Sequence, residues 1–251
     1  MFFQQLFNGI VIGSIYTSIA LGLTMIYGIL GIINWAHGEL YMLGAFATLF
    51  LVMSLKLPFL ASLPLTILIM SIFGVILDKL VFSPLRGRSD NTIILGTLGI
   101  SFFLMNLGII LFGPNPQTIA NPLNEMNVTI GNVTMTYGRI LVVVVTIICI
   151  IFFSWFINKT KTGKAMRATA QDSHAARLMG IDIKFISIIT SIIGAALAGV
   201  AGCLAGPLGT VTPTMGTMMV TKAFAVVILG GLGNVTGAIF GGFVLGIAET
   251  M

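Results

Sequence analysis

Seven long apolar stretches constrain this chain more than any other feature of its sequence. Each has about 17–27 residues, which is long enough for a helix to cross the hydrocarbon core of a bilayer. Helices and closed barrels are the structures that satisfy their backbone hydrogen bonds in lipid, and apolar runs of this length indicate helices. We therefore expect an all-α, polytopic membrane helix bundle with about seven apolar spans, at residues 6–30, 38–54, 63–82, 91–112, 138–157, 185–205 and 222–248.

The composition supports a membrane protein and argues against a metal or redox site. Of its residues, 57% are hydrophobic and 8% are charged, whereas soluble domains have about 25% charged residues. The two cysteines, Cys149 and Cys203, lie in apolar stretches and form no CxxC pattern. The sequence therefore favours neither a disulfide framework nor a zinc site, and we expect the chain to bind no metal or cofactor.

The basic residues predict the orientation of the spans. Nine of the twelve lysines and arginines lie in the segments 79–90 and 158–184, while the segment 113–137 contains none. By the positive-inside rule, both basic loops are cytoplasmic and 113–137 is an outer loop. The alternating sequence NVTIGNVTMTY near the end of this outer loop predicts a small β-hairpin.

Three polar residues interrupt the apolar segment 24–46: Asn34, His37 and Glu39. In a continuous helix, Asn34, His37 and Tyr41 would share one face and Glu39 would point elsewhere. One interpretation is that these residues line a translocation path or brace a broken helix. The alternative is a polar cytoplasmic turn between the first two spans, with Asn34 capping the second helix.

Glycines recur largely at spacings of four in the segment 230–246. Such a pattern lets helices approach closely. A second interpretation is a discontinuous helix, broken near Gly231, Gly233 and Asn234, whose exposed backbone helps to form a translocation path. Lys222, at the start of this last apolar stretch, is expected at the outer end of a helix, with its ammonium group extended toward water.

The basic loop 158–184 has apolar residues at near-helical spacing between Gly163 and Gly180. The spacing predicts a short amphipathic helix at the inner face of the membrane. It is either a helix that lies on anionic lipid or a docking element for a cytoplasmic partner.

Three segments together resemble the bacterial branched-chain amino-acid ABC transporter permeases. They are 24–46, the loop from Gly163 to Ile181, and 222–249 (KAFAVVILGGLGNVTGAIFGGFVLGIAE). The resemblance is closest to the first of the two permeases that such a transporter pairs. Related permeases for urea and short amides carry a very similar AHGE segment.

The resemblance implies one transmembrane permease domain over residues 1–251, in the inner membrane of a bacterium. Its expected partners are a second homologous permease, two cytoplasmic ATPases and a periplasmic or surface-anchored solute-binding protein. The ATPases would drive alternating access through an ATPase-coupling loop, for which we expect these residues: Gly163, Arg167, Ala168, Asp172, Gly180 and Ile181. Family members usually continue for some tens of residues and end with a further span, so we expect a C-terminally truncated chain.

The same residues also bear on other possible functions. The chain contains no GxxxxGK[ST] phosphate-binding loop, so we expect a transport subunit that is not an enzyme, with ATP used by its partners. A urea or short-amide importer is the first alternative. A stand-alone secondary transporter or channel would need intramembrane carboxylates for ion coupling, and Glu39 and Glu249 are the candidates close to apolar spans.

Overall fold

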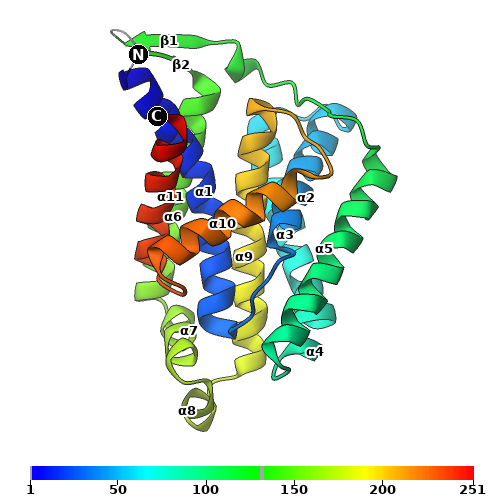
Figure 1. Cartoon of the computed structure of the whole chain (residues 1–251), viewed down its shortest axis with the longest axis vertical. Helices are drawn as coiled ribbons and strands as arrows, with labels where there is room; N and C mark the ends of the chain where they lie inside the picture. The colour runs from blue at the N-terminus through cyan, green and yellow to red at the C-terminus, as the bar shows by residue number, and fades with distance from the viewer. Residues whose placement is uncertain (1, 131–132) are drawn as a thin grey trace.

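The computed structural model describes residues 2–130 and 133–251 as a bundle of long helices (Figure 1). Among these residues, six helical segments are long and apolar enough to cross a membrane. They correspond to the first six predicted stretches and confirm a polytopic helical membrane protein. These segments are Phe2–Leu30, His37–Ser54, Phe59–Leu85, Asp90–Phe112, Tyr137–Lys159 and Ile183–Leu208.

Several of these segments contain more than one element. Short π-helical turns at Phe50–Ser54 and Asp78–Phe82 extend the second and third segments, and a 3₁₀ turn at Gly206–Leu208 ends the sixth. The helices are α1 (Phe2–Leu30), α2 (His37–Leu49), α3 (Phe59–Leu77), α4 (Ser83–Leu85), α5 (Asp90–Phe112), α6 (Tyr137–Lys159), α7 (Lys161–Gln171), α8 (Ser173–Leu178), α9 (Ile183–Ala205), α10 (Met215–Gly230) and α11 (Val235–Thr250).

The seventh apolar stretch forms two helices rather than one straight span. Helices α10 and α11 meet at an angle of 120° across a short connection, which confirms the predicted broken helix. The pair also begins earlier than predicted, at Met215. In Figure 1, α10 crosses the middle of the bundle and α11 then returns alongside α1.

The segment 113–137 and the two basic segments lie at opposite ends of the bundle (Figure 1). The segment 113–137 contains a 3₁₀ turn (Pro122–Asn124) and the predicted hairpin, whose strands are β1 (Asn127–Ile130) and β2 (Val133–Thr136). The strands pair antiparallel, with Val128 opposite Met135. This hairpin lies at the same end as both chain termini, whereas α4, α7 and α8, beside the basic segments, lie at the opposite end (Figure 1). We call these the hairpin end and the basic end.

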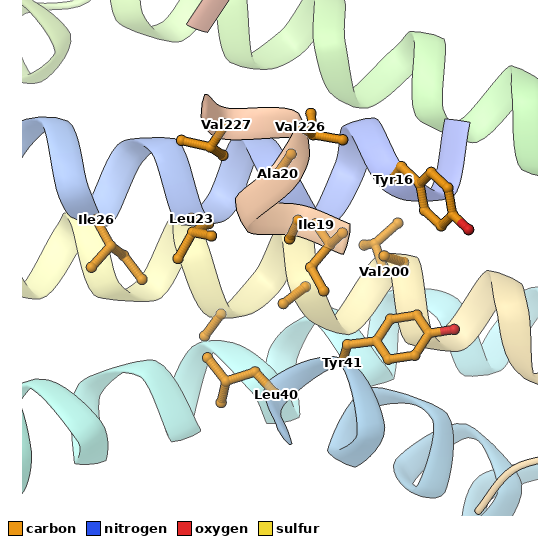
Figure 2. Packing of buried hydrophobic residues seen from close by; sticks show 14 of the residues in the cluster. Tyr16, Ile19, Ala20, Leu23, Ile26, Leu40, Tyr41, Val200, Val226 and Val227 are labelled. Atoms are coloured by element: carbon orange, nitrogen blue, oxygen red, sulfur yellow. The ribbon is translucent and has the colours of Figure 1, made fainter. Parts of the chain in front are cut away.

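Small residues bring the central helices into close contact. A methyl group at Gly242 of α11 would lie 2.9 Å from the Cα atom of Thr17 in α1. The predicted close packing of the 230–246 glycines is therefore present together with the helix break. Figure 2 shows how Ile19 and Leu23 of α1 pack near Val226 of α10 and Leu40 of α2.

Two helix triplets have corresponding arrangements. Helix α1 runs toward the basic end, and after a break the chain continues into α2 and α3. Helix α9 runs toward the hairpin end, and after a break the chain continues into α10 and α11 (Figure 1). In the first triplet, α3 packs along α9, and in the second, α11 packs along α1. The middle helices correspond in the same way, because α2 contacts α9 and α10 contacts α1. This is the arrangement of an inverted repeat, in which interrupted helices meet near the middle of the membrane.

Candidate functional site

Helix α2 begins deep inside the bundle. The imidazole Nε2 of His37, its first residue, lies 3.1 Å from the carbonyl oxygen of Ile19 in α1. A methyl group at Gly22 of α1 would lie 2.9 Å from the same Nε2 atom. Gly22 precedes the end of α1 by eight residues, or about 12 Å of helix. The connection therefore leaves the exposed Gly31 and returns into the bundle, where α2 begins beside α1.

The connection from α1 to α2 is held by specific backbone and side-chain hydrogen bonds. Gly31 ends α1 with a φ of 66°, a conformation that glycine adopts without steric cost. Asn34 Oδ1 accepts a hydrogen bond of 3.1 Å from the amide of Ala36. Thr97 of α5 donates to the carbonyl of Ile33 (3.0 Å) and accepts from the amide of Trp35 (3.3 Å). These bonds satisfy backbone groups that the break removes from helical pairing.

The predicted polar face is only partly present. Asn34 lies before α2, so it does not share a helical face with His37 and Tyr41. His37 and Tyr41 are one helical turn apart in α2 and both are buried. Asn34 nevertheless braces the break through the hydrogen bond to Ala36, as one of the two sequence interpretations expects.

Glu39 points away from His37, toward the place where α2, α5 and α10 meet. Ser101 of α5 donates a hydrogen bond of 3.1 Å to Glu39 Oε1. Glu39 Oε2 has no hydrogen-bond partner among the residues that the structure describes, although the side chain is fully buried. A methyl group at Gly216, near the start of α10, would lie 2.7 Å from this oxygen. The first turns of α2 and α10 thus meet around a buried carboxylate.

Unpartnered buried polar atoms gather around this break. Within the described ranges 2–130 and 133–251, four such atoms come from residues 24–39: Thr24 Oγ1, Asn34 Nδ2, His37 Nδ1 and Glu39 Oε2. Buried polar groups are normally hydrogen-bonded, and exceptions call for a functional or solvent explanation. This region therefore has the polar character expected of a translocation site, and its role in transport stays a prediction.

The second break lies between α10 and α11, at the predicted residues. Gly231 and Gly233 have φ values of 89° and 80°, which glycine adopts more easily than any other residue. Asn234 caps α11 by accepting a hydrogen bond of 3.1 Å from the amide of Gly237. A methyl group at Gly28 of α1 would lie 3.1 Å from the Cα atom of Gly233, so this turn touches the last part of α1.

The predicted coupling helix is two helices. Asp172 separates α7 from α8, because its Oδ1 accepts hydrogen bonds from the amides of His174 (2.8 Å) and Ala175 (2.9 Å). These hydrogen bonds lower the pKa of the Asp172 carboxyl below its ordinary value. Gly163 was expected before the helix but lies inside α7, packed against the end of α6.

The other predicted coupling residues lie at the exposed basic end. The Arg167 guanidinium is exposed and donates a hydrogen bond of 3.1 Å to Asn158 Oδ1. Ala168 and Ile181 are half-buried, and Gly180 follows α8 with a φ of 83°. Two apolar side chains at the tip, Leu178 and Met179, are 77% and 83% exposed.

Sequence reasoning missed two charged clusters. Asp78 of the π-helical turn is buried, accepts hydrogen bonds from Ser187 and Ser191, and forms an ion pair of 3.5 Å with Arg86. Lys222 lies near the middle of α10 and pairs with Glu249, so its expected place at an outer helix end is wrong. The signal for each was a charged residue within an apolar stretch, but the partners became visible only in the fold.

The fold and the interrupted helices define a polytopic helical membrane protein with the architecture of a transporter. The family described as branched-chain amino acid transport system / permease component matches residues 5–251. The chain belongs to this family. No solved structure matches it significantly.

Individual relatives agree with the family. The high-affinity branched-chain amino acid transport system permease protein BraD of Pseudomonas aeruginosa is 37% identical, over 99% of this chain and 85% of that protein. The corresponding protein LivH of Escherichia coli K12 is 34% identical, over 100% and 85%. The permease protein LivM of the same organism is more distant, at 27% identity over 94% and 61%.

Proposed function

We propose that this chain is the transmembrane permease subunit of an ATP-driven importer of branched-chain amino acids. It would pair with a second, homologous permease and with two cytoplasmic ATPases, and receive its solute from a periplasmic or surface-anchored binding protein. The relatives named as permeases of branched-chain amino acid transport systems support this proposal. The similarity to both LivH and LivM supports a pair of related permeases.

The proposed coupling mechanism rests on one observation, a groove at the basic end. It has a volume of about 730 Å³ and is formed by three parts of the chain. These parts are the end of α1 (27–31), the α7–α8 junction (169–173), and the α10–α11 turn at Leu232 and Gly233. A partner that moves α7 and α8 would thus act next to both helix breaks.

The basic end is the proposed cytoplasmic side of the inner membrane. Exposed apolar side chains on a charged element are a common feature of protein-binding surfaces, and Leu178 and Met179 offer such a patch. We assign this patch and Arg167 to the ATPase contact. The chain itself would bind no cofactor, since its sequence lacks a phosphate-binding loop and the partner subunits would use the ATP. The binding protein would approach the hairpin end.

In alternating access, ATP-driven closure of the ATPases would push α7 and α8 toward the groove. Rigid-body movement of packed helices, with a few residues absorbing the change in backbone angles, is a common form of such transitions. Gly231 and Gly233 would absorb this change, because they lie in the turn that contacts the groove.

The test uses the complete importer reconstituted in proteoliposomes. Arg167→Glu is expected to lower ATP-dependent leucine uptake about tenfold or more, because a charge reversal at a protein contact is strongly unfavourable. Arg88→Glu, an exposed residue of the other basic segment, is the matched control and should transport normally. Membrane insertion is measured for both variants. Normal uptake with Arg167→Glu would contradict the coupling assignment, and a wild-type importer that moves no branched-chain amino acid would contradict the proposed function.

A further inference from the structure

Three polar side chains from three helices meet on the hairpin side of α10. Lys222 Nζ of α10 forms an ion pair with Glu249 of α11. Lys222 Nζ also donates a hydrogen bond of 2.7 Å to the hydroxyl of Tyr16 in α1, and this hydroxyl donates one of 2.5 Å to Glu249 Oε2. Lys222 Nζ lies 5.1 Å from the centroid of the Tyr16 ring. We call these three residues the Lys–Glu–Tyr cluster.

A groove between α10 and α11 opens onto this cluster. Its volume is about 360 Å³, at the lower end of the range of about 300–1,000 Å³ for small-molecule sites. Both charged residues line it, and the rest of the lining is small or apolar: Thr221, Ala225, Leu245 and Ala248. The groove therefore presents one positive charge, one negative charge and an aliphatic wall.

The charges of Lys222 and Glu249 argue against a position that faces lipid. The side chains of Lys222 and Glu249 are 26% and 41% exposed, although both belong to apolar helices. Charged groups in membrane segments are costly in lipid and almost always face the bundle interior or a water-filled cavity. An exposed ion pair also contributes little to folding stability. A water-filled path accounts for both the charges and their exposure.

The cluster is placed toward the side from which an imported solute arrives. Glu249 is next to Thr250, whose hydroxyl donates a hydrogen bond of 3.3 Å to the carbonyl of Gln5 near the start of α1. The start of α1 lies at the hairpin end, opposite α7 and α8 (Figure 1). In Figure 2, the hydroxyl of Tyr16 is directed toward the same end, away from Leu23 and Ile26.

We propose that the groove at Lys222, Glu249 and Tyr16 binds the zwitterionic head of an aliphatic amino acid on its way through the permease. The carboxylate of the amino acid pairs with Lys222 and its ammonium group pairs with Glu249, so the ligand replaces the internal ion pair. The Tyr16 hydroxyl, already bonded to both side chains, holds them in place. The aliphatic side chain contacts Ala225, Leu245 and Ala248. This inference rests on the proposed import function and names the groups that would recognise its solute.

The experiment measures protection of a groove cysteine in the assembled importer. The native cysteines are replaced (Cys149→Ala, Cys203→Ala), and Ala225→Cys places a thiol in the groove. A charged, membrane-impermeant thiol reagent is added from the hairpin side of nanodisc-embedded complexes. Leucine at about ten times its dissociation constant is expected to slow labelling about tenfold, because only about a tenth of the sites are then free. Isopentylamine and 4-methylpentanoate, which each lack one charge of leucine, should protect weakly.

Variants of Lys222 and Glu249 test whether these two residues bind leucine in the groove. Lys222→Met and Glu249→Gln should each abolish protection by leucine. Where a single variant fails to assemble, the double variant Lys222→Gln with Glu249→Gln leaves no unpaired charge in the groove and should still lose protection. Protection that survives these changes, or a thiol that the reagent never reaches, would overturn the proposal. Leucine uptake by the parent importer is measured in parallel, so a failure of the import function is distinguished from a failure of this site.

Discussion

The break between α1 and α2 and the break between α10 and α11 both separate helices of the bundle, but different chemistry holds each one. The first is buried and polar: Asn34 and Thr97 bond its backbone, and Asn34 is fully buried. The second is exposed and depends on glycine: Gly231 and Gly233 adopt positive φ, and Asn234 caps the next helix in an exposed position.

This difference suggests a division of work between the two breaks. The first break is tied to α5 by two hydrogen bonds of Thr97, so it keeps α2 in a fixed position. The second turn touches α1 and the coupling groove, with glycines that tolerate changes in backbone angle. We expect the second break to move during transport and the first to stay in place.

Helix α2 follows the first break and α10 precedes the second. Stability should be most sensitive to substitution at the contact between these two helices. A methyl group at Gly38 of α2 would overlap the carbonyl of Gly216 in α10 and lie 2.8 Å from Val220 Cβ. Gly38→Ala should lower the free energy of unfolding in detergent micelles by about 3 kcal/mol, because backbone cannot move aside easily. In Gly99→Ala of α5, the new methyl meets nothing within 4 Å. This control should be neutral or stabilising by about 0.5–1 kcal/mol, and equal losses in both variants would contradict the close contact.

The same substitution at the two breaks should have unequal effects. Asn34→Ala leaves the amide of Ala36 without its acceptor in a buried place, which should cost about 2 kcal/mol of unfolding free energy. Asn234→Ala removes an exposed helix cap, for which about 1 kcal/mol is typical. Chemical unfolding of both variants in mixed micelles measures the difference. A larger loss at Asn234 would reverse the comparison.

The sequence was informative wherever a local pattern decides the structure. Apolar length predicted seven spans, of which six are long helical segments. Period-two alternation predicted the hairpin at 127–136, and the glycines near Asn234 predicted the break in the seventh. The two central residues of the hairpin lie outside the described ranges. Each of these features depends on residues close together in the chain, so no knowledge of the tertiary fold was needed.

The depth of the first break could not be read in the same way. A polar segment such as 31–37 suits a surface turn and a buried break equally well, because both satisfy its backbone groups. Only the contacts of His37 with α1 and of Glu39 with Ser101 decide between them. Likewise, Lys222 and Glu249 lie 27 positions apart and meet because α10 and α11 join at 120°.

The break between α7 and α8 should show the smallest effect, because it is fully exposed. Hydrogen bonds from Ala175 and His174 lower the pKa of Asp172. The carboxylate therefore stabilises α8 above the ordinary pKa of aspartate, and this contribution disappears as the pH falls through the lowered pKa. Amide hydrogen exchange of α8, normalised to α7, should increase over this pH range. Asp172→Asn keeps a cap but removes the titration, so its exchange ratio should stay constant with pH. If the ratio varies equally in both proteins, the carboxylate does not control α8, and the exposed break is held by its neighbours rather than by its own cap.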